Sequence, residues 1–282
     1  MIYFDNAATS WPKPSSVVEA VGGAFNYAAN PGRGSHKFAM KSAREVFGVR
    51  EKIKNFIGAE STRNIVFTKN CTEGLNIAIF GSLQAGDHVI TTVFEHNSVL
   101  RPLFAMKERG VDLDVIDCDF KDIPQEILKR ICPETRMVAI SHVDNLVGRI
   151  KDIRTIGNSL SREILFLVDA AQSIGHIPID VDEMRIDLLA APGHKALMGP
   201  MGTGFLYVRD EMTVLPFMVG GTGSRITFAF GIIPIGFIAV KGKLNLSLLQ
   251  LCFLQRENIR IRFFKLFSKA FFDDRSEAIN VP

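Results

Sequence analysis

The sequence predicts an α/β fold built on a mostly parallel central sheet that is flanked by helices. Two observations carry this prediction. Apolar runs of strand length alternate with segments of helical spacing from residue 41 to residue 208, which is the pattern of consecutive βαβ units. The run 164–168 is almost wholly apolar, as expected of a strand that is buried on both faces. The 282 residues are enough for one large domain and part of a second.

The elements are expected in regular alternation after an extended start. Residues 1–16 contain Pro12 and Pro14 and are expected to form an extended arm rather than a helix. The loop 30–36 combines a proline, two glycines, an arginine and a histidine, a composition typical both of a functional loop and of a plain connector. Helices are expected at residues 17–27, 41–56, 72–80, 99–109 and 125–131. Strands are expected at residues 65–67, 89–92, 111–116, 137–141, 164–168, 188–190 and 205–208.

Composition and charge exclude several kinds of site. The four cysteines show no CxxC or CxxH spacing and the six histidines form no HExxH pattern, so no metal is expected. Unpaired cysteines, and the lack of a signal peptide in the first residues, favour a cytoplasmic protein. The net charge of +3 comes from residues 226–282, which hold eight Lys or Arg against four Asp or Glu. A basic tail of this kind indicates no nucleic-acid surface.

An acid and an amine are expected to reach the same edge of the sheet. Asp169 follows the run 164–168, at the carboxyl end of a strand, where open α/β sheets bind their ligands. Lys195 follows the next expected strand, about one βα unit further along the chain. Pyridoxal phosphate requires a lysine for the Schiff base and an acid for its pyridinium nitrogen. Gln172, in the turn after Asp169, is expected to reach the ring hydroxyl.

Each of these residues has a simpler interpretation when it is taken alone. Asp169 would cap a helix that follows it, and Lys195 would be a solvated surface charge. A histidine that follows a strand, such as His96, is more often structural than catalytic. The joint order of these residues is more specific than any one of them, and it favours a site for pyridoxal phosphate.

Six motifs stand in a fixed order over residues 1–224. They are Asp5-Asn6-Ala7-Ala8-Thr9, Asn30-Pro31-Gly32-Arg33-Gly34-Ser35-His36, Thr72-Glu73-Gly74-Leu75-Asn76, Glu95-His96-Asn97-Ser98-Val99-Leu100, Val168-Asp169-Ala170-Ala171-Gln172 and Gly193-His194-Lys195. With this set the chain resembles the cysteine desulfurase and selenocysteine lyase group of the class V aminotransferase family. The resemblance implies the large domain of the pyridoxal-phosphate-dependent transferase fold type I. It also implies three parts: an arm at 1–16 that belongs to the small domain and the active site, a cofactor-binding large domain at 17–224, and an atypical apolar and basic tail at 225–282.

The resemblance assigns roles to polar residues at the sheet edge. The turn at Cys71 and Thr72 opens a helix, whose free N–H groups suit the cofactor phosphate. Its alternative is a capping turn with Thr72 as the cap, and both interpretations can hold at once. Cys71 is expected to supply a backbone contact and not a nucleophile. His96 is implied to stack on the cofactor ring and to shuttle a proton.

Three further residues complete the implied site. Asn145 contacts the ring hydroxyl and the substrate side, and His194 contacts the phosphate. Lys195 is, with His96, an implied catalytic residue: it holds the cofactor and then moves the proton of the substrate Cα. Pro192 stands where some relatives have a serine, which removes one hydroxyl donor to the phosphate.

The implied activity is that of a pyridoxal-phosphate-dependent cysteine desulfurase. Such an enzyme converts L-cysteine to L-alanine and passes the sulfur to an enzyme cysteine as a persulfide. The implied partners are a small-molecule substrate (cysteine or selenocysteine), a sulfur-acceptor protein and a second copy of the chain, with no nucleic acid and no membrane. Two alternatives stay open: a selenocysteine lyase or another class V aminotransferase-type enzyme, and a truncated remnant without catalysis.

The resemblance stops after about residue 224. The family's C-terminal small domain carries the nucleophilic cysteine and an arginine for the substrate carboxylate, and neither is recognisable in the tail. The run 226–240 is apolar but shorter than the roughly 20 residues of a membrane span. It is expected to be a buried helix, a membrane-surface segment or, as we favour, part of a tail translated out of frame after Ser224. Cys252 is assigned no role, because its apolar neighbours indicate a buried cysteine. We therefore expect a truncated or frameshifted chain that is incomplete as a catalyst.

Overall fold

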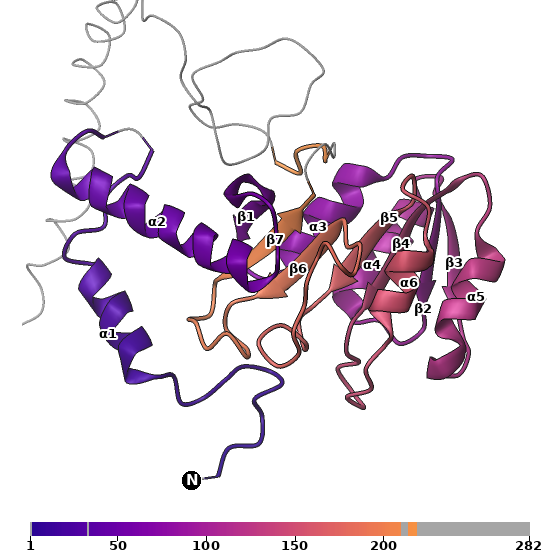
Figure 1. The fold of residues 1–282 in the computed structure, drawn as a ribbon, viewed down its shortest axis with the longest axis horizontal. Coiled ribbons are helices and arrows are strands. Elements are labelled where there is room, and N and C mark those ends of the chain that lie inside the picture. Colours follow the sequence, from indigo (N-terminus) through magenta and orange to yellow (C-terminus); the bar gives the residue numbers. More distant parts are fainter. Residues whose placement is uncertain (1, 33, 210–213, 219–282) are drawn as a thin grey trace, which may run out of the picture. The chain divides into compact units, whose positions relative to one another are not determined.

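A computed structural model describes residues 2–32, 34–209 and 214–218, and one seven-stranded sheet organises this part of the chain (Figure 1). The strands are β1 (Ile65–Thr68), β2 (His88–Thr92), β3 (Asp112–Ile116), β4 (Thr135–Ser141), β5 (Leu165–Asp169), β6 (Leu188–Pro192) and β7 (Gly204–Val208). Their order is β1-β7-β6-β5-β4-β2-β3, and of these strands only β7 runs against its neighbours. The predicted α/β class with a mostly parallel sheet is confirmed.

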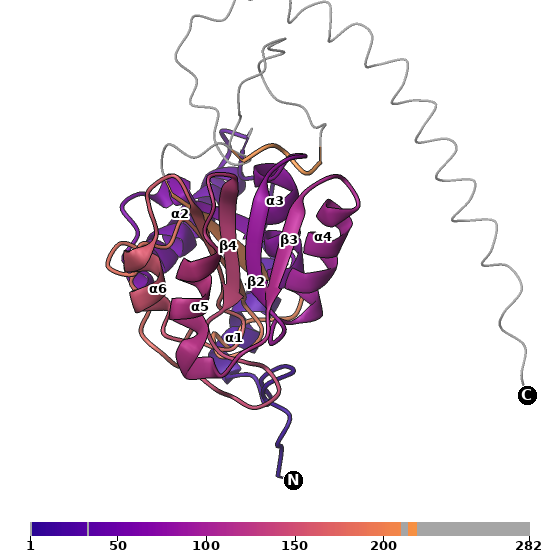
Figure 2. The same cartoon turned by 90° about the vertical axis from the view of Figure 1, so that its right-hand side faces the viewer.

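Helices cover both faces of this sheet. They are α1 (Ser15–Ala24), α2 (Lys37–Phe56), α3 (Cys71–Ser82), α4 (Asn97–Lys107), α5 (Ile123–Arg130) and α6 (Ile153–Ser159). Side chains alternate along each strand, so Leu165 and Leu167 of β5 pack with α3 and α4, whereas Phe166 and Val168 pack with α5 and α6. Figure 2 shows α3 and α4 on one side of the strands and α5 and α6 on the other. The sheet is therefore the middle layer of three.

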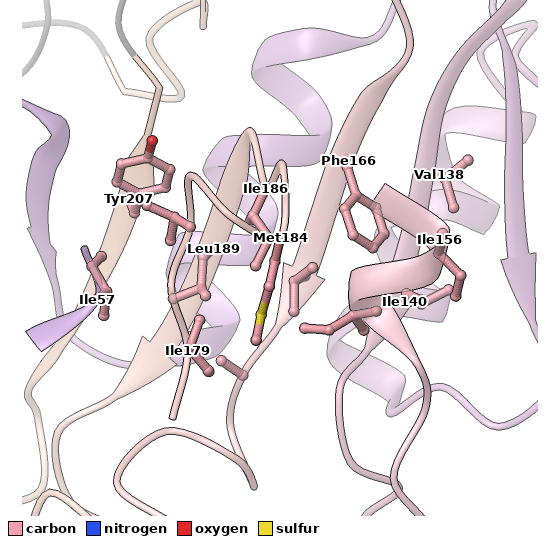
Figure 3. Close-up of a cluster of buried hydrophobic side chains, with 14 of the residues drawn as sticks. Ile57, Val138, Ile140, Ile156, Phe166, Ile179, Met184, Ile186, Leu189 and Tyr207 are labelled. Atoms are coloured by element: carbon pink, nitrogen blue, oxygen red, sulfur yellow. The ribbon is translucent and has the colours of Figure 1, made fainter. Parts of the chain in front are cut away.

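The strands in the middle of the sheet are buried on both faces. Every residue of β5 and β6 is buried. Figure 3 shows Phe166, Ile140 and Ile156 together on the α6 side, with Met184 and Ile186 from the β5–β6 connection beside them. Burying an apolar side chain of this size stabilises a fold by roughly 1.5–3 kcal/mol. This core fixes the strand ends from which the polar side chains project.

The connection between β5 and β6 differs from the prediction. The expected βα unit is wrong here, because residues 170–187 form turns and no helix. Pro178 and Gly175, whose φ is 85°, disfavour helical geometry in this segment. A Cβ added at Gly175 would lie 3.0 Å from the Cβ of Ala196. The turn after β5 therefore packs closely on the loop that carries Lys195.

Most predicted elements are found, with shifted ends. α2 begins earlier than predicted, at Lys37, because the ring nitrogen Nδ1 of His36 accepts the N–H of Ala39 at 3.4 Å and caps the helix. The end of the loop 30–36 is thus a helix cap. The short helix α6 has no counterpart in the prediction, and the side chain of Asp152 caps it.

Several expectations fall outside the described residues. These are the expectations for Arg33, for Cys252 and for the tail at 225–282, including the change of reading frame. The division into arm, large domain and tail stays a prediction. In the part of the chain that the structure describes, no helix combines the length and the apolar character needed to cross a bilayer.

Candidate active site

The carboxyl ends of β1, β2, β4, β5 and β6 open onto one pocket. β2, β4, β5 and β6 are parallel, and β1 points the same way because β7, antiparallel to both, separates it from β6. The pocket encloses about 540 Å³ of empty space, its open mouth included. All the predicted site residues line it: Cys71, Thr72, His96, Asn145, Asp169, Gln172, His194 and Lys195.

Asp169 is a buried carboxylate with one oxygen in use. It ends β5, opposite Ser141 of β4 and Ala190 of β6. Its Oδ1 accepts the N–H of Ala171 at 2.8 Å and the S–H of Cys71 at 3.3 Å, and no donor among the described residues binds Oδ2. Burial raises the pKa of this carboxyl, while the two hydrogen bonds and nearby positive charges oppose the rise. Asp169 can therefore accept one more hydrogen bond, as a protonated ring nitrogen requires.

Cys71 supports this carboxylate through its side chain. The thiol is buried and donates to Asp169. Burial, and after it the negative charge of Asp169, raises the pKa of the thiol well above its usual value. A thiol in this state stays protonated near neutral pH and is a poor nucleophile. The backbone contact with the cofactor stays a prediction, and the Cys71 side chain contacts the acid of the site.

The turn before α3 is capped by Asn70 and not by Thr72. Asn70 Oδ1 accepts the N–H of Glu73 at 2.8 Å. The predicted cap at Thr72 is wrong, because the helix already begins at Cys71. The hydroxyl of Thr72 lies instead 2.7 Å from Oγ of Ser98. A helix N-terminus keeps free N–H groups and a positive dipole end, so the turn suits a phosphate.

His96 caps α4 with one of its ring nitrogens. Nδ1 accepts the backbone N–H of Ser98 at 3.1 Å, so the neutral ring carries its proton on Nε2. The hydroxyl of Ser98 also lies 2.9 Å from Nδ1. Ser98 therefore bridges His96 and Thr72. Sequence reasoning gave Ser98 no role, although a serine inside the motif 95–100 and at a helix start was a usable signal.

The N-terminal arm is fastened to the loop that carries Lys195. The carbonyl oxygen of His194 accepts hydrogen bonds from the N–H of Ser10 (3.1 Å), the hydroxyls of Thr9 (3.1 Å) and Ser10 (3.0 Å), and Nζ of Lys13 (2.7 Å). Burial lowers the pKa of the His194 imidazole, and the charges of Lys195 and Lys13 lower it further. The ring is therefore neutral at pH 7, and a neutral imidazole can donate one hydrogen bond.

Gln172 and Asn145 differ in how firmly they are held. Nε2 of Gln172 donates to the carbonyl of Ala7 at 3.2 Å, so the arm orients this amide and leaves its oxygen for a ligand. No hydrogen bond within the described residues fixes the amide of Asn145, which also lines the pocket. Asn145 is free to turn toward a ligand, whereas Gln172 is already set.

Sequence reasoning missed part of the lining. Besides Ser98, the residues without a predicted role are Asn70, Ser141, Val143 and Ala171. Each lies within a few residues of the carboxyl end of a strand, which was the available signal. The described residues contain no group of three or more His, Cys, Asp or Glu side chains that could hold a metal ion.

The donor set of the pocket fits pyridoxal phosphate. Asp169 offers a carboxylate oxygen that no donor among the described residues binds, Lys195 offers an amine, and the start of α3 offers backbone N–H groups and the hydroxyl of Thr72. Asp169 and Lys195 line the same pocket, and the positive charge of Lys195 opposes the rise in the pKa of the Asp169 carboxyl. This combination of groups is the one that the cofactor needs.

Comparison with known sequences agrees with this arrangement. The sequence pattern of the family described as aminotransferase class-V matches residues 2–229. A probable cysteine desulfurase from Methanothermobacter thermautotrophicus is 40% identical over 228 residues, which cover 78% of this chain and 56% of that protein. The chain spans about half the length of the curated relatives it matches.

Solved structures share the fold of the described residues. The apo structure of a cysteine desulfurase from Thermococcus onnurineus is 37% identical with a TM-score of 0.71, covering 78% of this chain and 57% of that one. SspA, solved in complex with cysteine, is 34% identical with a TM-score of 0.73, covering 78% of this chain and 65% of its own. Because the family pattern extends over residues 2–229 and fold and pocket agree with it, the chain belongs to the aminotransferase class-V family.

Proposed function

We propose that this chain binds pyridoxal 5′-phosphate in the pocket described above and derives from a cysteine desulfurase. The reaction proposed for the whole protein converts L-cysteine to L-alanine, with the sulfur passed to an enzyme cysteine as a persulfide. One observation carries the proposal: Asp169 and Lys195, which follow the adjacent strands β5 and β6, line the same pocket as the start of α3. The relatives named cysteine desulfurase support the choice of substrate.

The lining residues divide into groups by the part of the cofactor they suit. Asp169 would hold the ring nitrogen. Thr72 and the first amides of α3, with His194, would hold the phosphate. Asn145 and Gln172 would face the ring hydroxyl. His96 would cover the ring face, and when bound the cofactor supplies an electron sink for bonds at the substrate Cα.

Proton movement in this proposal belongs to two side chains. Nζ of Lys195 would hold the cofactor. Once the substrate has replaced it there, the free Nζ would accept the proton of the substrate Cα and return it. His96 carries its proton on Nε2 because Nδ1 is occupied by the N–H of Ser98, so it can donate to a leaving group in the pocket. Sulfur transfer would form a sulfur–sulfur bond between an enzyme thiolate and the substrate sulfur. The carbon–sulfur bond would break with its electron pair left on the substrate carbon, which takes up a proton to give alanine.

A selenocysteine lyase is the second candidate, and one observation favours it. Cys71 is the cysteine that lines the pocket within the described residues, and its buried thiol is bound to Asp169. A reaction without an enzyme persulfide would not need a thiolate here. A cofactor-binding remnant without catalysis remains the third candidate. The homodimer, the sulfur-acceptor protein, the cytoplasmic location and the division into 1–16, 17–224 and 225–282 are part of the same proposal.

Visible absorption tests cofactor binding directly. Purified full-length chain with added pyridoxal phosphate is expected to show a bound-cofactor band that Lys195→Ala abolishes and Lys69→Ala, at an exposed lysine outside the pocket, leaves intact. Alanine and sulfide released from cysteine would then identify a desulfurase, and release from selenocysteine alone the lyase. A band that survives in Lys195→Ala, or no band in the parent chain, would contradict the proposal.

A further inference from the structure

A buried ion pair contacts Ser141, one of the residues that line the pocket. Nζ of Lys151 is 3.1 Å from Oε1 of Glu95, and neither side chain is accessible to solvent. Lys151 is among the largest side chains that are fully buried. Neither residue lines the pocket, and the proposed chemistry does not use them.

The polar atoms of this pair are satisfied by the ends of two strands. Glu95 accepts the hydroxyl of Thr92, at the end of β2, through Oε1 and the backbone N–H of Ser141, at the end of β4, through Oε2. Nζ of Lys151 donates to Oγ of Ser141 at 2.7 Å. Ser141 is thus held by both partners, through its backbone and through its side chain, and Ser141 lines the pocket.

The pair also joins the two loops that bring catalytic side chains to the pocket. Glu95 directly precedes His96, the cap of α4. Lys151 closes the loop that leaves β4, where its N–H donates to the carbonyl of His142 at 2.9 Å, and Asn145 lies within this loop. In addition, the backbone of Ser141 is in register with Asp169 on the neighbouring strand. The ion pair therefore connects the loops of β2 and β4 to the strand that ends in the acid.

The physical chemistry of buried ion pairs makes stability a poor reason for this one. Withdrawing two charges from water costs about as much as their attraction returns, and apolar replacements of similar volume are often as stable. What a satisfied buried pair supplies is fixed geometry, since each partner has one low-energy position. We propose that Glu95 and Lys151 are positioning residues, which fix His96, Ser141 and Asn145 relative to Asp169. This inference rests on the proposed cofactor site.

The double variant Glu95→Gln/Lys151→Met carries the test. It removes both charges at similar volume, whereas either single variant leaves an unpaired charge inside the protein. The matched control is Asp187→Asn/Arg209→Met, which removes an ion pair at the opposite edge of the same sheet. Full-length chains are compared by thermal unfolding without cofactor, by the dissociation constant for pyridoxal phosphate, and by the visible circular dichroism of bound cofactor, which reports a fixed ring orientation.

The expected result is a dissociation constant raised about ten-fold or more, and a reduced visible dichroism per bound cofactor, in the double variant alone. Thermal unfolding would stay cooperative in both variants. A double variant with parent-like affinity and dichroism overturns the inference, whatever its melting temperature. Equal losses of affinity in the two variants overturn it as well, because they would indicate a general structural effect. If the parent chain binds no cofactor in a Lys195-dependent way, the proposed function itself fails, which is a different outcome.

Discussion

Two buried aspartates of the same sheet differ in how their oxygens are used. Asp187, before β6 at the amino edge, is 6% exposed, and Asp169, at the carboxyl edge, is 4% exposed. Asp187 has both oxygens occupied, Oδ1 by Nε of Arg209 and Oδ2 by the N–H of Phe166 at 2.8 Å. Asp169 keeps Oδ2 without a donor among the described residues. The two carboxylates are similarly buried but unequally paired: both oxygens of Asp187 are bound within the fold, whereas Asp169 keeps one oxygen for the cofactor that we propose.

The largest expected effect is a loss of stability on removing Asp187, the fully paired aspartate. Asp187→Ala removes the acceptor of the Phe166 N–H and the partner of Arg209, and we expect a loss of about 3–4 kcal/mol in the free energy of unfolding. Cofactor affinity should stay within a factor of about two, since the site lies at the other edge. Urea unfolding at pH 7 gives the first quantity. A loss below about 1 kcal/mol would mean that full pairing does not mark a structural carboxylate.

His142 is a second buried group with an atom unpaired in the described part of the chain, again at the carboxyl edge, and its effect on stability is expected to depend on pH. His142 follows β4 at the carboxyl edge, and its buried Nδ1 has no partner among the described residues. Burial, and then the charge of Lys151, lowers the pKa of this imidazole to about 4. The unfolded chain, with a histidine pKa near 6.5, takes up this proton first, so the stability is complete above that pH and is lost as the pH falls toward 4. The loss should reach about 3 kcal/mol at most.

Urea unfolding between pH 7 and pH 4.5 measures this loss. The variant His142→Leu removes the titrating group at similar volume, so its stability should fall less steeply over the same range. If the stability of the parent chain and of His142→Leu fell equally with pH, the imidazole would have the same pKa in the folded and unfolded states. This result would contradict the expected effect of its burial.

The third expected effect is a loss of cofactor affinity on changing Asp169, the aspartate with one oxygen unpaired within the described residues. Asp169→Asn keeps the shape of the side chain but replaces the open oxygen's negative charge, and we expect the affinity for pyridoxal phosphate to fall at least about 100-fold, which is roughly 2.7 kcal/mol. The free energy of unfolding should change by less than about 1 kcal/mol, because a desolvated carboxylate with a raised pKa contributes little to stability. Absorption titration and urea unfolding measure the two. A large loss of stability with unchanged affinity would reverse the roles of Asp169 and Asp187.

The sequence predicted which residues lie at the carboxyl edge of the sheet, but not how their side chains are paired. Strand ends are readable from apolar runs, and parallel strands end at one edge, so Asp169, His96 and Lys195 were predicted together. The chemistry of pyridoxal phosphate supplied the roles of Asp169 and Lys195, and the motif resemblance supplied the role of His96. The open oxygen of Asp169 was not predictable, because pairing at a buried carboxylate depends on side chains brought in by folding, such as Cys71.

Other features were missed for similar physical reasons. The turns between β5 and β6 replace an expected helix, since Gly175 packs on Ala196 from a later loop. The cap of α3 is Asn70 rather than Thr72, a shift of helix start that single-sequence patterns do not resolve. The pair of Glu95 and Lys151 looks like two ordinary surface charges in the sequence, and only the fold reveals their burial.

The smallest expected effect concerns that helix cap. Asn70→Ala removes the acceptor for the N–H of Glu73, and we expect a loss of about 1 kcal/mol in the free energy of unfolding. Asn70→Asp, which keeps an acceptor and adds a negative charge near the helix start, serves as the control and should retain the stability. Equal losses in both variants would indicate that packing at the turn, and not the cap, stabilises α3.

The central claim is that Asp169 and Lys195 serve one molecule of pyridoxal phosphate, and mapping the lysine that holds the cofactor tests it most directly. The full-length chain is incubated with pyridoxal phosphate, reduced with borohydride, digested and analysed by mass spectrometry. We predict one dominant adduct, on Lys195, that is much weaker in Asp169→Asn. A dominant adduct on another lysine, or equal labelling of Lys195 in Asp169→Asn, would contradict it.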